Sequence, residues 1–531
     1  MNKYTVFDEK EENFNELFVD IKNRKLKNEQ LFKKRIMGLT SYFKSPQEKL
    51  MPSYDDEKNF HLFRIPMSKY QLGIYEEARV EERKEELSNI KKRKNPLYDN
   101  ETSSSTYRIF SRAYCNFVFP NTIKRPMPNE NKKEDVVAIE NIDIIEDDEY
   151  DNIVTDKSYQ VRINEALEFL KEHSYEYLTP LGLETYSPKF AKILENILNP
   201  LYKGLHLVYS NFKTLEGIGI LKLVLQANGY VEFKIIKNKG NIWSINMSEE
   251  DIGKPAFVSY TGDEDDETKE IYRNIYSNNW ENVPVSITEI LKKYSSNNIY
   301  GDIVKIFMIT SSGAEGISLK NGRFVHILEP YWHPVRVQQV IGRVRRICSH
   351  QELDPKDRTV EVFMYLMTFS EDQLKDQLST ELMLKDRSII DNKVVLTTDE
   401  YIYEKASIKE QINKDFIKNM KESAIDCNLH KSSNEKDKYT CFSFNNANIN
   451  NYIYAPSIYE DEEDSVSKVN EDIVSLKAKK ITLGAKNYAI TEDLKLYDYD
   501  SYILAINDQD QRPLYIGKLD KISKPPRIIY E

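Results

Sequence analysis

The stretch that decides the fold runs from Val304 to His350. It reads VKIFMITSSGAEGISL (residues 304–319), then NGRFVHILEPYWHPVRVQQVIGRVRRICSH (residues 321–350). An apolar run ends in a loop of small residues with one carboxylate, a second apolar run follows, and an arginine-rich segment with helical spacing comes last. Strands that alternate with helices in this order predict a parallel sheet with helices on both faces. In such a sheet, catalytic groups lie at the carboxyl ends of the strands.

The arginine-rich segment predicts a functional helix face. Gln339, Arg343 and Arg346 stand at positions i, i+4 and i+7, which share one face of an α-helix. Two guanidinium groups there suit a polyphosphate, because their donors match phosphate oxygens and stabilise charge on a transferring phosphoryl group. Arg336 and Arg345 extend the basic patch, and no acidic residue of the segment neutralises it. A salt-bridged surface helix is the alternative, but it explains the Gln and Gly spacing only as accident.

The loop after the first strand, Ser311 to Gly316, also suits a phosphate or nucleic-acid contact. Small residues let a backbone approach such a ligand closely, and Glu315 is placed to orient a water or a neighbouring lobe. A Gly-x-x-Gly loop is weak evidence alone, and a plain strand-to-helix turn explains it equally well.

Several motifs in the same order resemble those of superfamily-two helicases and translocases. TSSGAEGISL (310–319) and QQVIGRVRR (338–346) look like motifs V and VI, HLVYSNF (206–212) stands in the place of motif IV, and SYTGD (259–263) in that of the next motif. EPYWHPVRVQQVIGRVRR is similar to the version in Swi/Snf-type enzymes and in helicase-like proteins of nucleocytoplasmic large DNA viruses. YRIFSRAYCNFVFP and KNMKESAIDC look like segments of that viral branch, whose relatives include the small subunit of the poxvirus early transcription factor. The resemblance covers residues 187–370.

This resemblance implies roles for individual residues. Arg343 and Arg346 would act as arginine fingers on ATP, which with magnesium is bound mainly by a first lobe. Gln339 would help to position the hydrolytic water or the other lobe. The positions linked to the nucleotide are Gly313, Glu315, Gly316 and Gly342. The positions linked to nucleic acid are Ser210, Asn211, Ser312, Arg336 and Arg345. No protein ligand for a metal is implied in this chain.

The chain departs from the family pattern because no Gly-x-x-x-x-Gly-Lys-Ser/Thr occurs. Gly253-Lys254 is followed by Pro255, and Gly517-Lys518 by Leu519, so there is no loop to hold the β- and γ-phosphates. The acidic runs at 148–151 and 263–266 contain Asp-Glu-x-Asp but lie away from any phosphate loop, and we interpret them as coincidental.

Two explanations of this departure remain. In the first, the chain is the second lobe of a split or truncated motor that hydrolyses ATP only beside a partner with the phosphate loop. In the second, it is a non-catalytic module that binds nucleic acid or a transcription complex. The arginine face favours the first explanation, since such a face has little use without a nucleotide opposite it.

Composition bears on how the chain can bind nucleic acid, on its compartment and on metal binding. The formal net charge of −11 argues against a chain that coats nucleic acid through its overall charge, so contacts must come from local patches. The four cysteines, Cys115, Cys348, Cys427 and Cys441, are too scattered for a disulfide framework and predict a reducing, intracellular compartment, with a virion or viral factory as further settings. A metal site at Cys427, His430 and Cys441 is disfavoured, because a fourth ligand is missing.

The expected organisation is a RecA-like α/β lobe with extensions. Residues 1–120 form a helical or linker region that follows a missing first lobe, 121–158 an acidic disordered or surface insertion, 159–370 the RecA-like lobe, 371–430 a helical extension and 431–531 a small mixed or β-containing tail. The expected partners are DNA or RNA, a first-lobe protein and viral transcription machinery. No apolar run reaches membrane-spanning length, so no membrane partner is expected.

Overall fold

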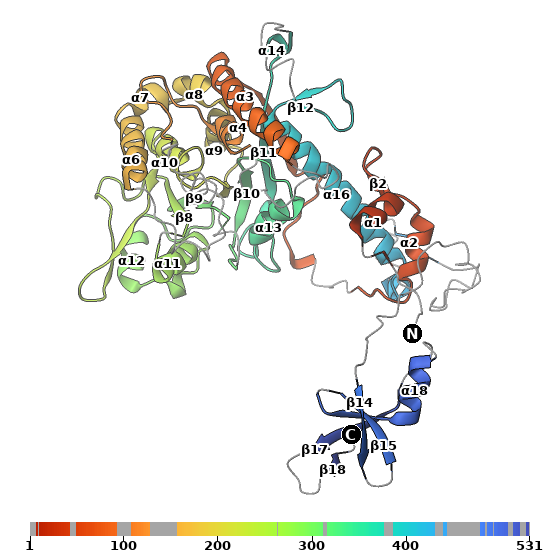
Figure 1. Ribbon diagram of the computed structural model, residues 1–531. Helices are drawn as coiled ribbons and strands as arrows, with labels where there is room; N and C mark the ends of the chain where they lie inside the picture. Colours follow the sequence, from red (N-terminus) through yellow and green to blue (C-terminus); the bar gives the residue numbers. More distant parts are fainter. Residues whose placement is uncertain are drawn as a thin grey trace. The chain divides into compact units, whose positions relative to one another are not determined.

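The computed structural model describes most of the chain in two compact units (Figure 1). The larger unit comprises residues 15–456, and the smaller one residues 1–14 and 457–531. The described residues are 7–8, 10–42, 49–92, 108–127, 157–262, 264–311, 316–375, 386–430, 439–442, 478–483, 486–491, 493–507, 513–520 and 527–529. The centre of the acidic insertion, residues 128–156, lies outside these ranges.

A seven-stranded parallel sheet forms the centre of the larger unit. Its strand order is β3-β11-β10-β4-β9-β8-β5, and every neighbouring pair is parallel. The strands are β3 (Phe60–Pro66), β4 (Leu205–Tyr209), β5 (Val231–Glu232), β8 (Ala256–Tyr260), β9 (Val304–Ile309), β10 (Gly322–Ile327) and β11 (Glu361–Thr368). The central strands are apolar and buried along almost their whole length, as a sheet covered on both faces requires.

Helices cover both faces of this sheet. One face packs against α4 (Ile109–Asn116), α6 (Lys157–Glu172), α9 (Pro188–Leu198) and α10 (Ile218–Ala227). The other face packs against α11 (Asp266–Tyr276), α12 (Val285–Leu291) and α13 (Pro334–Val344). Alternate residues of a strand enter opposite cores, so Val208 belongs to the first and its neighbours Leu207 and Tyr209 to the second. The expectation of a RecA-like α/β fold is confirmed.

Local sequence signals explain several element boundaries. Ser187 caps α9, because its hydroxyl accepts from the Phe190 amide and Pro188 takes the first helical position. The residues from Tyr230 to Ile236 do not form one continuous strand. Only β5 joins the main sheet, while β6 (Ile235–Lys237) forms an antiparallel hairpin with β7 (Trp243–Ile245).

The N-terminal region supplies the edge of the sheet. Strand β3 lies in parallel register with β11. Asn59 Nδ2 and His61 Nε2 each lie 2.8 Å from the Glu361 carboxylate, which fixes the start of this pairing. The long helix α3 (Lys69–Lys92) follows β3 and packs against α4 and α8 (Pro180–Tyr186).

The 25-residue helix α16 (Thr398–Glu422) extends from the sheet to a small N-terminal cluster. Its first turn contacts α4 and β11, and its later turns contact β2 (Lys25–Leu26) and α2 (Glu29–Ile36) (Figure 1). Thr397 and Glu400 form a capping box at its N-terminus, with each side chain bonded to the other's backbone amide. Shorter elements of this unit are β1 (Val19–Asp20), α7 (Ser174–Tyr177), α14 (Glu371–Lys375), β12 (Asp386–Arg387) and β13 (Val395–Leu396). The division between the two units falls within α1 (Glu11–Phe18).

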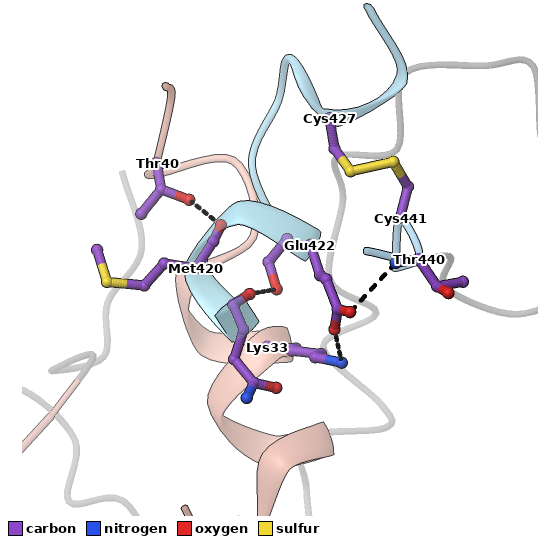
Figure 2. Close-up of a disulfide and its surroundings, with 9 residues drawn as sticks. Lys33, Thr40, Met420, Glu422, Cys427, Thr440 and Cys441 are labelled. Atoms are coloured by element: carbon purple, nitrogen blue, oxygen red, sulfur yellow. Dashed lines mark hydrogen bonds and ion pairs between the residues drawn. A yellow bond between two sulfur atoms is a disulfide. The ribbon is translucent and has the colours of Figure 1, made fainter. Parts of the chain in front are cut away.

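A disulfide between Cys427 and Cys441 lies just beyond α16 (Figure 2). Beside it, Lys33 Nζ lies 2.5 Å from a Glu422 oxygen, and the Thr440 amide donates to the other oxygen at 3.2 Å. This pairing corrects the expectation of unpaired cysteines and weakens the inference of a reducing compartment. Fourteen positions separate the two cysteines, and the fold closes that distance because α16 ends between α2 and the 439–442 segment.

The smaller unit contains a five-stranded antiparallel sheet with the order β14-β15-β16-β17-β18. Its strands are Ala478–Leu483, Lys486–Thr491, Lys495–Asp498, Tyr515–Asp520 and Arg527–Ile529, and α18 (Tyr499–Asn507) lies between β16 and β17 in the chain. Tyr488, Leu496 and Leu519 form its buried core. Among the described helices of both units, none combines the length and hydropathy of a membrane span.

Candidate nucleotide and nucleic-acid site

Three neighbouring strands bring the expected site residues to one edge of the sheet. β4 ends at Tyr209, β10 at Ile327 and β9 at Ile309, and these strands lie side by side in the order β10-β4-β9. The segments that follow them carry Ser210 and Asn211, Glu329, and the small-residue loop. The parallel arrangement therefore collects motifs that are more than one hundred residues apart in the sequence.

Ser210 and Asn211 are buried and bonded to Glu329. The Ser210 hydroxyl lies 3.1 Å from both Glu329 oxygens, and Asn211 Nδ2 donates to one of them at 3.0 Å. The Asn211 backbone amide donates to the same carboxylate, and Tyr209 donates its hydroxyl hydrogen to Asn211 Oδ1 at 2.8 Å. The polar side chains of this loop are thus engaged within the protein, and Glu329 sets the loop's shape.

Sequence reasoning missed Glu329. Its position directly after a buried strand, at the edge where the site residues gather, was the available signal. The carboxyl is 1% exposed, and this burial raises its pKa, whereas the Asn211 amide and the charges of Lys189 and Arg112 act in the opposite direction. The pKa of this carboxyl is therefore determined by burial and by neighbouring groups rather than by solvent.

Arg112 lies beside this carboxylate as a fully buried cation. Its guanidinium is 5.4 Å from the Phe212 ring centroid and 5.3 Å from the Trp332 ring centroid, which places it against two aromatic rings. None of its three nitrogens has a hydrogen-bond partner among the described residues, and burial lowers its pKa. The side chain contributes charge to the cluster without fixing an atom in it.

Helix α13 places Arg343 against the segment that follows the small-residue loop. Arg343 Nη1 donates to the Ile317 carbonyl at 3.4 Å, and the Leu319 amide donates to the Arg343 carbonyl at 2.9 Å. Arg343 is buried, whereas Gln339 is exposed. The segments 310–319 and 338–346 therefore contact each other through Arg343.

The expectation that Arg346 shares a helix face with Gln339 and Arg343 is wrong. Helix α13 ends at Val344, and Arg346 lies beyond it in an exposed turn. The helix stops there because the Ser349 hydroxyl donates to the Val344 carbonyl at 2.8 Å and accepts from the Arg346 amide at 3.3 Å. The turn still leaves Arg346 near the end of the same helix.

The small-residue loop itself is described only at its ends. Ser312, Gly313 and Glu315 lie outside the described residues, so their expected roles are untested. Gly316 has a φ of 73°, a conformation that favours glycine. At both Gly316 and Gly342, a Cβ would meet no other described atom within 4 Å.

Arg336 and Arg345 lie against aromatic rings. The Arg336 guanidinium is 5.4 Å from the Tyr331 ring centroid, and that of Arg345 is 5.6 Å from the ring centroid of Tyr54. Burial raises the pKa of Tyr209, and the positive charge of Arg336 opposes this rise. The described residues contain no group of three acidic, histidine or cysteine side chains arranged to hold a metal.

Comparison with known proteins identifies sequence relatives among large DNA viruses. The chain is 25% identical to a protein of Acanthamoeba polyphaga mimivirus classed as an ATP-dependent RNA helicase, with 96% of this chain and 60% of the relative aligned. A second mimivirus protein of the same class is 27% identical over 77% of this chain and 53% of its own length. A termination factor NPH-I homologue of African swine fever virus is 29% identical over 50% of this chain and 35% of its own length.

These matches relate the chain to helicase-like proteins of large DNA viruses, as the sequence motifs indicate. The chain spans about half to three fifths of the length of the two mimivirus relatives. No family model matches the sequence. Among solved structures, the C-terminal part of the Fun30 ATPase domain aligns with 68% of this chain and 99% of its own length, at 14% identity and a TM-score of 0.31.

Proposed function

We propose that this chain supplies the second lobe of a superfamily-two nucleic-acid motor that acts in viral transcription. In this proposal, residues 159–370, together with β3, form the RecA-like lobe, and ATP hydrolysis requires a first lobe that carries the phosphate loop. The names of the viral relatives support a helicase-like role in transcription. The absence of a phosphate-loop motif from the 531 residues supports the dependence on another lobe.

The contact between α13 and the segment after β9 carries this proposal. Arg343 bonds to that segment through both its guanidinium and its carbonyl, so the arginine helix is joined to the residues that directly follow the small-residue loop. A residue that senses a nucleotide across a cleft is thereby joined to a loop proposed to contact nucleic acid. Such a connection is what a motor needs to link hydrolysis to movement.

The residues present fit part of a nucleotide site. Arg343, Arg346 and Gln339 would face ATP, and hydrolysis of bound ATP would supply the free energy for movement. The arginines of this chain would stabilise negative charge on the phosphates, and Gln339 would hold a water. Magnesium would be held by the first lobe. Gly313, Glu315 and Gly316 would adjust the loop that responds to the nucleotide.

ATPase assays with a first-lobe protein test the split motor. We expect this chain alone to hydrolyse no ATP above background, and to stimulate hydrolysis when mixed with the first-lobe protein. Arg346→Ala should reduce the stimulation by about 10³-fold, the effect typical of an arginine finger. Arg387→Ala is a matched control, because Arg387 is also exposed but lies on β12. Stimulation that survives Arg346→Ala would refute the proposal.

Gly342 offers a second test that separates function from stability. A Cβ at this helical position meets open space in the chain, so Gly342→Ala should stabilise α13 by roughly 0.5–1 kcal/mol. If another lobe or a nucleotide packs closely against this position, the same change should lower the stimulated ATPase activity at least tenfold. A variant that is more stable and fully active would show that nothing approaches Gly342.

The alternative is a non-catalytic nucleic-acid-binding module. It is favoured by the same absence of a phosphate loop and by the paired arginine and aromatic groups at Arg336 and Arg345. This reading predicts affinity for DNA or RNA that is independent of ATP and falls on Arg336→Ala or Arg345→Ala. The salt dependence should become shallower by about one unit of slope for each lost phosphate contact. An unchanged slope in both variants would count against direct contact.

A further inference from the structure

A continuous line of buried polar contacts joins helix α16 to the Ser210–Asn211 loop. It begins at Asp399 in the first turn of α16, where Lys189 Nζ lies 2.6 Å from Asp399 Oδ2. Neither side chain is more than 1% exposed. Asp399 Oδ2 also accepts from the Met367 amide at 3.0 Å, so the carboxylate anchors α16 both to α9 and to the end of strand β11.

Asn116, the last residue of α4, connects Lys189 to Glu329. Its Oδ1 accepts from Lys189 Nζ at 2.8 Å, and its Nδ2 donates to Glu329 Oε2 at 3.1 Å. The Asn116 carbonyl accepts from the Ser187 hydroxyl, the same group that caps α9. An ammonium on one side and a carboxylate on the other allow only one orientation of this amide.

Glu329 completes the line, because it accepts from Ser210 and from both Asn211 donors. The order is therefore Asp399, Lys189, Asn116, Glu329 and the loop. Each step is a direct hydrogen bond between buried groups. These side chains connect four secondary-structure elements, α16, α9, α4 and the end of β10.

Stability alone is a weak reason for such a network. Buried ions lose their hydration, and well-packed apolar residues of similar volume often serve a core equally well or better. With Arg112, the cluster contains two cations and two carboxylates that are almost completely buried. What a hydrogen-bonded network gains over an apolar core is a defined position for every group.

We propose that Asp399, Lys189, Asn116 and Glu329 are positioning residues that set the Ser210–Asn211 loop for nucleic-acid binding according to the position of α16. The inference rests on the proposed function, because it requires that loop to lie in the nucleic-acid interface. A change at Asp399 shifts Lys189, which releases the Asn116 amide and removes its bond to Glu329, so the carboxylate is then held by the donors of the loop alone. Loop geometry, and with it affinity, then depends on a helix outside the proposed interface.

The direction in which affinity changes when a buried charge is removed tests this proposal. Asp399→Asn removes one negative charge from a chain of net charge −11, so simple electrostatics predicts tighter binding to a polyanion or no change. The positioning role predicts weaker binding. Glu422→Gln is the matched control, since it removes the same charge from the other end of α16, where Glu422 pairs with Lys33.

The measurement is fluorescence anisotropy of the full chain with labelled 30-nucleotide single-stranded and duplex DNA and RNA, at several salt concentrations. Asp399→Asn should weaken binding at least fivefold with an unchanged salt slope, because no phosphate contact is lost. Glu422→Gln should stay within twofold of the unsubstituted chain. Asn116→Ala, which changes no charge, should weaken binding as Asp399→Asn does and replaces it in the comparison if the latter is not folded by circular dichroism.

The outcomes separate the two proposals. If Arg336→Ala weakens binding but neither Asp399→Asn nor Asn116→Ala does, the positioning role is refuted and the proposed function stands. If Glu422→Gln weakens binding as much as Asp399→Asn, the effect is a general loss of helix packing and the positioning role is again refuted. A chain that binds none of the four probes would overturn both proposals.

Discussion

The two ends of α16 use the same chemical device for different purposes. At each end a lysine from another helix pairs with a carboxylate of α16, as Lys189–Asp399 at the start and Lys33–Glu422 at the finish. The first pair is almost completely buried and continues through Asn116 to Glu329. The second is somewhat more exposed and lies beside the disulfide (Figure 2). The first end is therefore held by a buried network of hydrogen bonds, and the second lies beside a segment that the disulfide closes into a loop.

The largest effect is expected from breaking the buried pair. Lys189→Met leaves Asp399 as an uncompensated buried charge and should lower the free energy of unfolding by about 3–5 kcal/mol. Urea unfolding followed by circular dichroism measures this. The double variant Lys189→Met with Asp399→Leu should recover most of the stability, because both charges are gone. A double variant as unstable as the single one would show that the pair itself, rather than an unpaired charge, is what matters.

The disulfide should dominate the other end. Cys441→Ser opens a cross-link between positions separated by 14 residues, for which the chain-entropy model gives about 3 kcal/mol. We expect the loss to be local, because the cross-link lies outside the sheet. Hydrogen exchange should accelerate in the last turns of α16 while the first turns keep their protection. Equal acceleration at both ends of α16 would show that the disulfide does not act on the last turns alone.

Acid offers a way to weaken the lobe while the disulfide stays intact. Burial lowers the pKa of His326 to about 3 and that of His350 to about 4, below the value of about 6.5 in an unfolded chain. Folded histidines with lowered pKa values stabilise the protein above pH 6.5, and this contribution is lost as the pH falls toward those values. From pH 7.5 to 5.5 the two residues should together lower the free energy of unfolding by about 2.7 kcal/mol.

The acid effect can be assigned by substitution. His326→Gln removes one titrating group, so the stability of the variant should depend less on pH over the same range. Urea unfolding at pH 7.5 and 5.5 gives both slopes, and identical slopes for the variant and the unsubstituted chain would exclude His326 as a source. The disulfide does not titrate, and the protection of the last turns of α16 should change less than that of β10.

The smallest effect is expected at the helix caps. Thr397 accepts from the Glu400 amide and donates to the Met367 carbonyl at 2.6 Å, so Thr397→Ala should cost about 1 kcal/mol. Thr397→Ser keeps the hydroxyl and should restore most of it. Ser423→Ala at the other end removes only a bond to the Asn419 carbonyl and should cost less. Thermal unfolding of the three variants ranks them, and a costlier Ser423→Ala would reverse the expected order.

The sequence predicts the central lobe well because its signals are local. Strands β4, β8, β9, β10 and β11 are runs of mostly apolar residues, and the turns and caps between them follow from a few neighbouring residues. The end of α13 was missed because Ser349, which terminates it, stands five positions beyond the last helical residue. The Cys427–Cys441 pairing was missed because the segment around Cys441 returns to the end of α16, where Thr440 and Phe442 bond to Glu422, and that return is visible only in the fold.

The sequence predicted which residues belong to the candidate site better than it predicted which partners they contact. The arginines and the Ser210–Asn211 loop were recognisable by type and spacing. Glu329 was overlooked because its function depends on partners more than one hundred positions away in β4 and α4. For the same reason Ser210 and Asn211 were expected near a ligand, and their bonds to an internal carboxylate could be learned only from the fold.

The place of β3 at the sheet edge has a consequence for how the chain folds. Its bonds to β11 join Asn59 to Glu361, a separation of 302 positions. Contacts between residues so distant in sequence form late, because a long loop must close before the contact is gained. During synthesis, β3 therefore leaves the ribosome long before its partner strand exists. We expect fragments that stop before β11 to expose β3 and to require chaperones or to aggregate.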